Sequence, residues 1–253
     1  MSDTSINQAI QQQFGAVAAN YTTSAVHASG ADLQGLLAAA ALSGRERVID
    51  VGCGAGHVTV GLAPTAGHIT AVDLTTAMLA QTQAQVTAKG YTNVTVREAD
   101  VAALPFADGS FDVAVSRYAA HHFADPSAAL HEIRRVVVPG GRFLLVDVVA
   151  PPLAMADSFL NAVELLRDAS HVRDHTVAQW IALCAAAGFT AVHQQTWSVR
   201  LEFTSWVTRM ATPAPEVQQL QRMLAAAPAA VAAALGIEAD GSFHIPVALI
   251  SAS

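Results

Sequence analysis

Three glycines at alternate positions, with an acidic residue at the end of the next apolar run, are the strongest chemical signal in the sequence. Gly52, Gly54 and Gly56 directly follow the apolar segment 48–51, and glycine lets a ligand approach the bare backbone. The expected helix N-terminus after them favours a carboxylate or phosphate nearby. Asp73 ends the next apolar run, where a carboxylate can accept two hydrogen bonds from a ribose diol.

The glycine spacing argues against a dinucleotide site. Such a site requires glycine at the first, third and sixth positions of the turn. Here the sixth position is His57, and the extra glycine, Gly56, is at the fifth. The nicotinamide interpretation is therefore disfavoured, and a purely structural turn is the alternative for the glycines taken alone.

Short β-branched runs alternate with helical stretches between residues 47 and 149, which is the pattern of a parallel sheet covered on both faces. Pro139, Gly140 and Gly141 are expected to stop a helix just before a strand. The expected strands are 47–51, 68–74, 94–98, 111–117 and 141–149, and the expected helices are 57–62, 76–89 and 127–137.

The pattern changes after Pro151 and Pro152. We expect helices over 154–168 and 177–187, then strands over 191–202 and 242–253. About forty residues of helical character separate these two strands, and prolines interrupt them.

Composition limits the possible functions. The 253 residues carry 13 Lys+Arg and 20 Asp+Glu, and the net charge of −7 disfavours a nucleic-acid partner. Apolar residues make up 53% and charged residues 13%, which is enough for a core and too little polarity for disorder.

The sequence also indicates the cellular compartment. Cys53 and Cys184 lie in an expected strand end and helix, so no disulfide framework is expected. The first twenty residues lack the features of a signal peptide, and no apolar stretch approaches the roughly 20 residues of a membrane span. We expect a cytoplasmic protein that does not bind a membrane.

Further motifs carry a family resemblance. Asp100 follows the third expected strand, and the pieces 99–112 and 132–141 read ADVAALPFADGSFD and EIRRVVVPGG. With the glycine turn, residues 10 to 150 resemble the class I S-adenosylmethionine-dependent methyltransferases, specifically the large group similar to the ubiquinone and menaquinone C-methyltransferases.

This resemblance implies an α/β fold. It is Rossmann-like, with helices on both faces of a seven-stranded, mostly parallel sheet, an antiparallel last strand and helical lid insertions. We expect a single domain over 1–253, with a cofactor-binding core over 35–150. The lid or substrate-cap segments would be 1–34, 150–176 and 203–241.

The resemblance also implies the cofactor S-adenosylmethionine, with S-adenosylhomocysteine as product. The three glycines would line its methionine part, and Asp73 would bind the ribose. Asp100 would accept a hydrogen bond from the adenine amino group. The other expected cofactor residues in the core are Cys53, Leu74, Met78, Val101, Ala102 and Arg117.

Three more residues are expected at the cofactor. Asp50 would orient the glycine turn and, through water, the cofactor's amino group; a satisfied buried carboxylate is the alternative. Tyr21 and His27 belong to a segment, Phe14 to Asp32, that looks like the lid helices of similar enzymes. The Tyr21 hydroxyl would contact the cofactor carboxylate, or the ring would only pack beneath the lid.

The loop after the fourth strand is expected to face the acceptor, because ligands of open α/β sheets bind at the carboxyl ends of the strands. This loop carries the candidate catalytic residues Tyr118, His121 and His122. An imidazole can take a proton near neutral pH, although either histidine could simply order the loop. The Asn- or Asp-Pro-Pro-aromatic motif of DNA base N-methylation is missing here, as is the aspartate of metal-dependent catechol methyltransferases. We therefore expect no metal.

A polar cluster over 164–174 resembles a subgroup that includes azapteridine, toxoflavin-type N-methyltransferases. It implies a planar, polar, nitrogen-rich acceptor on which Tyr118 or Trp206 could stack. A salt-bridged surface elbow is the alternative. The expected substrate-binding residues are Tyr118, His121, Glu164, Arg167, His171, Arg173 and Trp206.

Two other functions stay open. One is methylation of a quinone-like ring carbon, which would need a long apolar pocket instead of a short polar one. The other is a non-catalytic protein that kept the cofactor site. The expected partner is a small-molecule methyl acceptor, and the protein would be a monomer or homodimer.

Overall fold

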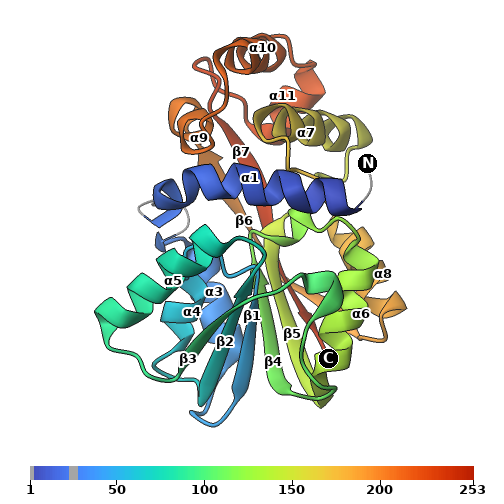
Figure 1. Cartoon of the computed structure of the whole chain (residues 1–253). Helices are drawn as coiled ribbons and strands as arrows, with labels where there is room; N and C mark the ends of the chain where they lie inside the picture. Colours follow the sequence, from blue (N-terminus) through green and yellow to red (C-terminus); the bar gives the residue numbers. More distant parts are fainter. Residues whose placement is uncertain (1–2, 23–27) are drawn as a thin grey trace.

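The computed structural model describes residues 3–22 and 28–253. These residues form a seven-stranded sheet of order β3-β2-β1-β4-β5-β7-β6 (Figure 1). Strands β1 to β5 pair in parallel, and β7 is antiparallel to both β5 and β6. The expected Rossmann-like sheet with an antiparallel last strand is thereby confirmed. The strands are β1 (Arg47–Val51), β2 (His68–Asp73), β3 (Val94–Glu98), β4 (Phe111–Arg117), β5 (Val137–Val148), β6 (Ala191–Leu201) and β7 (Phe243–Ala252).

Helices cover both faces of the sheet (Figure 1). Among the described helices are α1 (Asp3–Thr22), α3 (Ala31–Ala40), α4 (His57–Leu62), α5 (Thr76–Lys89), α6 (Pro126–Val136), α7 (Ala154–Arg167), α8 (Val177–Ala186), α9 (Phe203–Arg209), α10 (Ala214–Ala225) and α11 (Ala229–Leu235). Two short 3₁₀ turns, η1 (Val101–Ala103) and η2 (Ala120–His122), follow β3 and β4.

Alternation along the strands divides the core between the two faces. In β1, Val48 belongs to the core cluster that includes residues of α3 and α4, whereas Ile49 belongs to the cluster that includes residues of α6 and α8, because successive strand side chains point to opposite faces. Both residues are fully buried. A strand covered on both sides therefore reads as a continuous apolar run, which is why the sequence pattern placed these strands well.

Helix α1 crosses the carboxyl ends of the parallel strands, and α7, α9, α10 and α11 gather beyond it (Figure 1). It packs against α5 on one side and α9 on the other. The Gln13 amide donates to the Met210 carbonyl at 2.8 Å, which joins α1 to the segment after α9. The carboxyl edge of the sheet is thus covered by elements far apart in the sequence.

The Pro-Gly-Gly sequence does not stop a helix before the strand, contrary to the sequence prediction. Helix α6 ends at Val136 and β5 begins at once at Val137. Val137 pairs with Phe111 and Arg142 with Val113, so the register shifts across a bulge. Gly140 takes a φ of 78° there, a conformation that glycine adopts readily. Strand β5 therefore pairs with β4 on both sides of the bulge.

The lid segment also differs from the expected Phe14 to Asp32. Helix α1 begins at Asp3, and Asp32 belongs instead to α3, whose Leu33 and Leu36 are buried against the sheet. Helix α3 is therefore part of the core. Within residues 3–22 and 28–253, no helix has both the length and the apolar character of a membrane span.

Candidate functional site

The glycine turn after β1 takes left-handed backbone conformations. Gly52 has a φ of 68° and Gly54 a φ of 54°. A Cβ on Gly52 would lie 2.5 Å from the Cβ of Ala119, so Gly52 allows the loop after β4 to pack closely. A Cβ on Gly54 would meet nothing within 4 Å. Gly54 therefore leaves open space beside its backbone.

The Asp73 carboxylate holds this turn from the end of β2. Its Oδ2 accepts from the Gly54 amide at 2.9 Å and its Oδ1 from the Thr75 amide at 2.9 Å. Burial raises its pKa, and these amide hydrogen bonds oppose the rise. Each carboxylate oxygen has a second lone pair. Asp73 can therefore accept further hydrogen bonds from a ligand.

A cavity of about 210 Å³ lies at the carboxyl ends of β1, β2 and β4, and we call it the glycine-loop cavity. It brings together most residues that the sequence assigned to a cofactor: Tyr21, Gly52, Cys53, Gly54, Asp73, Leu74, Met78, Asp100, Val101, Ala102 and Arg117. Gly56 and Asp50 lie outside its lining. His27 lies outside the described residues.

Asp50 is buried beneath the glycine turn. The Thr59 hydroxyl donates to its Oδ2 at 2.5 Å, while Oδ1 has no hydrogen-bond partner among the described residues. Burial raises the pKa of this carboxyl to about 7. A buried polar atom without a partner is costly, and this one is left for a water or ligand group. The orienting role of Asp50 and the role of a buried structural carboxylate both stay predictions.

Helix α1 supplies a wall of the glycine-loop cavity that the sequence reasoning missed. Asn7, Ile10 and Phe14 line it, and their spacing places them on one helix face. The Asn7 amide donates to Asp100 Oδ2 at 2.7 Å, while Asp100 Oδ1 accepts from the Ala102 amide at 2.9 Å. The spacing was the available signal, but it could not say what that face covers. Other lining residues that were missed include His57, Ala99, Ala119, Phe123, Ala124 and Asp125.

The loop after β4 starts with a strained residue. Tyr118 has a φ of 53°, which is unusual for a bulky side chain and often marks a functional site. Arg117 lies over its ring, 4.5 Å from the centroid. The Arg117 Nε also donates to Asp32 Oδ2 at 2.6 Å in a buried ion pair. Helix α3 thus fixes Arg117 beneath the loop.

His121 and His122 follow in the η2 turn and have opposite protonation tendencies. Burial by itself would lower the pKa of His121, but Asp147 overcomes it and raises the pKa to about 9. Burial and the neighbouring His121 lower the pKa of His122 to about 4. The His122 Nδ1 lies 3.0 Å from the Ser170 carbonyl, which can only accept. At neutral pH His121 is therefore charged, and His122 is neutral with its proton on Nδ1.

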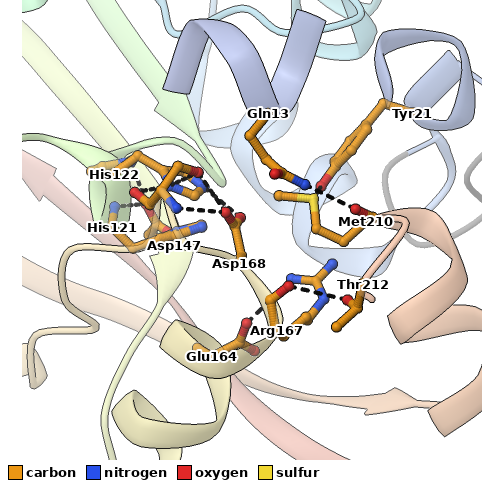
Figure 2. Close-up of polar contacts among 12 residues, drawn as sticks. Gln13, Tyr21, His121, His122, Asp147, Glu164, Arg167, Asp168, Met210 and Thr212 are labelled. Carbon is orange, nitrogen blue, oxygen red and sulfur yellow. Dashed lines mark hydrogen bonds and ion pairs between the residues drawn. The ribbon is translucent and has the colours of Figure 1, made fainter. Parts of the chain in front are cut away.

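A second cavity of about 60 Å³ adjoins these histidines, and we call it the charged cavity. Figure 2 shows some of its polar residues, namely Tyr21, His121, His122, Glu164, Arg167 and Asp168. Phe14, Tyr21, Tyr118 and His122 line both cavities. The charged cavity collects five expected substrate-binding residues: Tyr118, His121, Glu164, Arg167 and Trp206.

The other two expected substrate residues lie outside its lining. His171 is bound through Nε2 to Asn161 Oδ1 at 3.1 Å. Arg173 pairs with Asp157 at 2.8 Å, and its side chain is 37% exposed. For Arg173 the arrangement is the salt-bridged elbow that was the alternative reading.

Arg167 is fixed within the wall of the charged cavity (Figure 2). It contacts Glu164 Oε2 at 3.2 Å and donates through Nε to the Trp206 carbonyl at 3.0 Å. Its guanidinium lies 5.2 Å from the Trp206 ring centroid. Trp206 is 1% exposed, with one side of its ring already occupied.

Three further polar residues of the charged cavity were missed as site residues, namely Asp168, Asp174 and Arg209. Among the described residues, Asp174 Oδ2 and Arg209 Nε have no hydrogen-bond partner. Burial raises the pKa of Asp174 to about 8. Asp174 belongs to the polar cluster over 164–174 that the sequence analysis described. Arg209 is on α9, and no pattern in the sequence indicated that α9 lies beside this cluster.

Comparison with known proteins gives one coherent result. Residues 49–145 match the family model described as a methyltransferase domain. The uncharacterized methyltransferase YcgJ of Bacillus subtilis is 37% identical over 200 residues, covering 79% of each chain. The uncharacterized protein YafE of Escherichia coli is 36% identical over 197 residues, covering 78% of this chain and 95% of YafE. The crystal structure of YcgJ superposes with a TM-score of 0.84 at 34% identity, covering 87% of this chain and 97% of that one.

Proposed function

This chain belongs to the family of S-adenosylmethionine-dependent methyltransferases, and we propose that its acceptor is a small, planar heterocyclic or aromatic metabolite. One observation carries the proposal. The glycine-loop cavity shares the wall of Phe14, Tyr118 and His122 with the small charged cavity. A donor in the first cavity and an acceptor in the second would therefore be neighbours.

The residues of the glycine-loop cavity fit the cofactor. Gly54 leaves space at its backbone, while Asp73 and Asp100 offer carboxylate oxygens at two points of the wall. The free Oδ1 of Asp50 beneath the turn suits a water-mediated contact with an amino group. We propose that Asp73 binds the ribose and Asp100 the adenine amino group. When bound, S-adenosylmethionine supplies a methyl group on a positively charged sulfur.

The proposed mechanism rests mainly on alignment. The shared wall would orient the two reactants, and holding reactants in position can contribute about 7–11 kcal/mol to a reaction. Helix α1 covers the carboxyl edge and would exclude water. Because Asp147 keeps His121 protonated at neutral pH, we propose that His121 donates a hydrogen bond to the acceptor. It would serve as a proton acceptor only at alkaline pH.

The size and polarity of the charged cavity favour this acceptor class over a quinone. It measures about 60 Å³, and Glu164, Arg167 and Asp168 contribute charge to its wall. An isoprenoid quinone would need a long apolar channel. The same short, polar cavity supports the closer similarity to the azapteridine N-methyltransferases. Tyr118, which Arg117 covers on one face, would stack on the acceptor with its other face.

We propose that different segments of the chain enclose the acceptor and bind the cofactor. Helix α1 and the segments 150–176 and 203–241 would form the substrate cap, and the core, which includes α3, would bind the cofactor. The contacts between α1 and the segment after α9 support this division. The acceptor would then be enclosed by residues from both parts.

A two-step experiment tests the proposal. Calorimetry first measures binding of S-adenosylhomocysteine, with Asp73→Ala as the variant and Asp112→Ala as a control in a surface ion pair remote from this site. The protein is then incubated with S-adenosylmethionine and a panel of nitrogen heterocycles, phenols and short-chain quinones. Mass spectrometry records methylated products. A quinone as the sole product would contradict the proposed acceptor, and binding without any turnover would favour a non-catalytic protein.

A further inference from the structure

The two arginines in the wall of the charged cavity have different surroundings. Arg167 pairs with Glu164 at 3.2 Å. Arg209, at the end of α9, has no carboxylate within 4.0 Å among the residues that the structure describes. Its charge is therefore uncompensated at close range, although it faces the Tyr21 hydroxyl.

Two hydrogen-bond donors in this wall are buried without a partner. They are Arg209 Nε and Trp206 Nε1, neither of which has an acceptor among the described residues. Trp206 is 1% exposed. Leaving a buried donor unsatisfied costs about 1–3 kcal/mol, and more for a charged group. A ligand that offers oxygen atoms to both donors would remove this cost.

The acidic groups that face the charged cavity are largely occupied elsewhere. Glu164 contacts Arg167, and Asp168 Oδ1 accepts from the Ser170 hydroxyl at 2.6 Å and its amide at 2.9 Å. Asp174 resists ionisation, because burial raises its pKa to about 8. His121 adds a positive charge that Asp147 balances. Arg209 is left as the cation able to recruit an anion.

We propose that the methyl acceptor carries an oxyanion of carboxylate size, bound by Arg209 and the Trp206 Nε1. This inference rests on the proposed function, since it takes the charged cavity as the acceptor site. Arg209 and Trp206 line the charged cavity but not the glycine-loop cavity. The oxyanion therefore lies away from the shared wall, and the atom to be methylated lies toward it.

Matched probes test this without knowledge of the natural acceptor. Benzoate and benzamide have nearly the same shape and differ in charge. Their binding to the protein is measured by ligand-observed NMR, with and without S-adenosylhomocysteine. We expect benzoate to bind about tenfold more tightly than benzamide, a difference of about 1.4 kcal/mol. Arg209→Gln should remove this preference, and Arg209→Lys, which keeps the charge but loses Nε, should reduce it.

The control is Arg222→Gln, which changes an exposed arginine on α10 and should keep the preference. Circular dichroism verifies that each variant is folded. Equal binding of the two probes, no benzoate binding at millimolar concentration, or a preference that survives in Arg209→Gln would overturn the inference. S-adenosylhomocysteine binding is measured in the same samples. Failure of the unmodified protein to bind S-adenosylhomocysteine would count against the proposed function. The comparison of benzoate with benzamide alone tests the proposed oxyanion site.

Discussion

His121 Nδ1 lies 2.6 Å from Asp147 Oδ1, and the other oxygen of the same carboxylate accepts from the Ala120 amide at 2.7 Å. Asp147 is near the end of β5 and is 1% exposed. The carboxylate therefore fixes both the backbone of the loop after β4 and the protonation state of its histidine. One buried residue on a neighbouring strand thus sets the chemistry available at the acceptor cavity.

Replacing His121 by alanine should lower turnover without abolishing it. Acid–base assistance is typically worth about 10² to 10⁴ in rate, while alignment of the reactants would remain. Cofactor affinity, measured by calorimetry, should barely change. His193→Ala, on the exposed part of β6, is the matched control. Full turnover in His121→Ala would reduce this residue to a structural part of the loop.

The pH profile of turnover should report the protonation of His121. Its pKa is raised to about 9 by Asp147, so a hydrogen-bond donor at this position works below pH 9 and fails above it. We expect turnover to fall as the pH rises through about 9, and the His121→Ala profile should lack this step. Turnover that instead rises through about 9 would identify His121 as the proton acceptor.

His121 and His122 should make opposite contributions to the pH dependence of stability. The raised pKa of His121, about 9, contributes stability that is present below about 6.5 and lost as the pH rises through 9. The lowered pKa of His122, about 4, contributes stability that is lost as the pH falls from about 6.5 through 4. Urea unfolding at several pH values, compared between the protein and a variant that lacks the histidine, should show each contribution as a difference on the order of 2 kcal/mol. His121→Gln should flatten the alkaline side.

Asp73→Ala should weaken binding of S-adenosylhomocysteine by about 1.5 to 3 kcal/mol, if two charge-assisted hydrogen bonds to the ribose are lost. The glycine turn would also lose its bond from the Gly54 amide. Calorimetry of the variant beside Asp112→Ala measures the effect. Unchanged affinity would exclude the ribose assignment.

The buried pair of Arg117 and Asp32 should be costly to break from one side. Its side chains are 3% and 2% exposed, and the Arg117 Nε lies 2.6 Å from Asp32 Oδ2. Asp32→Ala removes this buried carboxylate. We expect a loss of about 3–5 kcal/mol in the free energy of unfolding. Asp112→Ala, which breaks the exposed pair with Arg47, should cost about 0–1 kcal/mol. Similar losses in both variants would contradict this difference.

The helical cap should close more firmly over bound ligands. Hydrogen exchange in α1 and in the segment 154–174 should slow when S-adenosylhomocysteine and an acceptor are both present, because these elements border the two cavities. Helix α6, on the face of the sheet, is the internal reference. Unchanged exchange in both cap segments would indicate a site that stays permanently open.

The sequence by itself determined the sheet and the glycine turn. Strand β1 and helices α4 and α5 have the bounds that the pattern predicted. Such elements follow from local properties, namely apolar periodicity and glycine at positions with left-handed backbone. The bulge at Gly140 escaped the prediction because its pairing with β4 decides whether Pro-Gly-Gly ends an element.

Only the tertiary structure decided which distant residues share a wall. Asn7 reaches Asp100, and Arg209 joins Asp174 at the charged cavity, because α1 and the cap helices cross the end of the sheet. The same packing turns Arg173 outward toward Asp157. It also gives the adjacent residues His121 and His122 very different pKa values, because only the His121 ring contacts the Asp147 carboxylate directly. Burial and charge at a site depend on every element that surrounds it, and no local pattern in the chain encodes those neighbours.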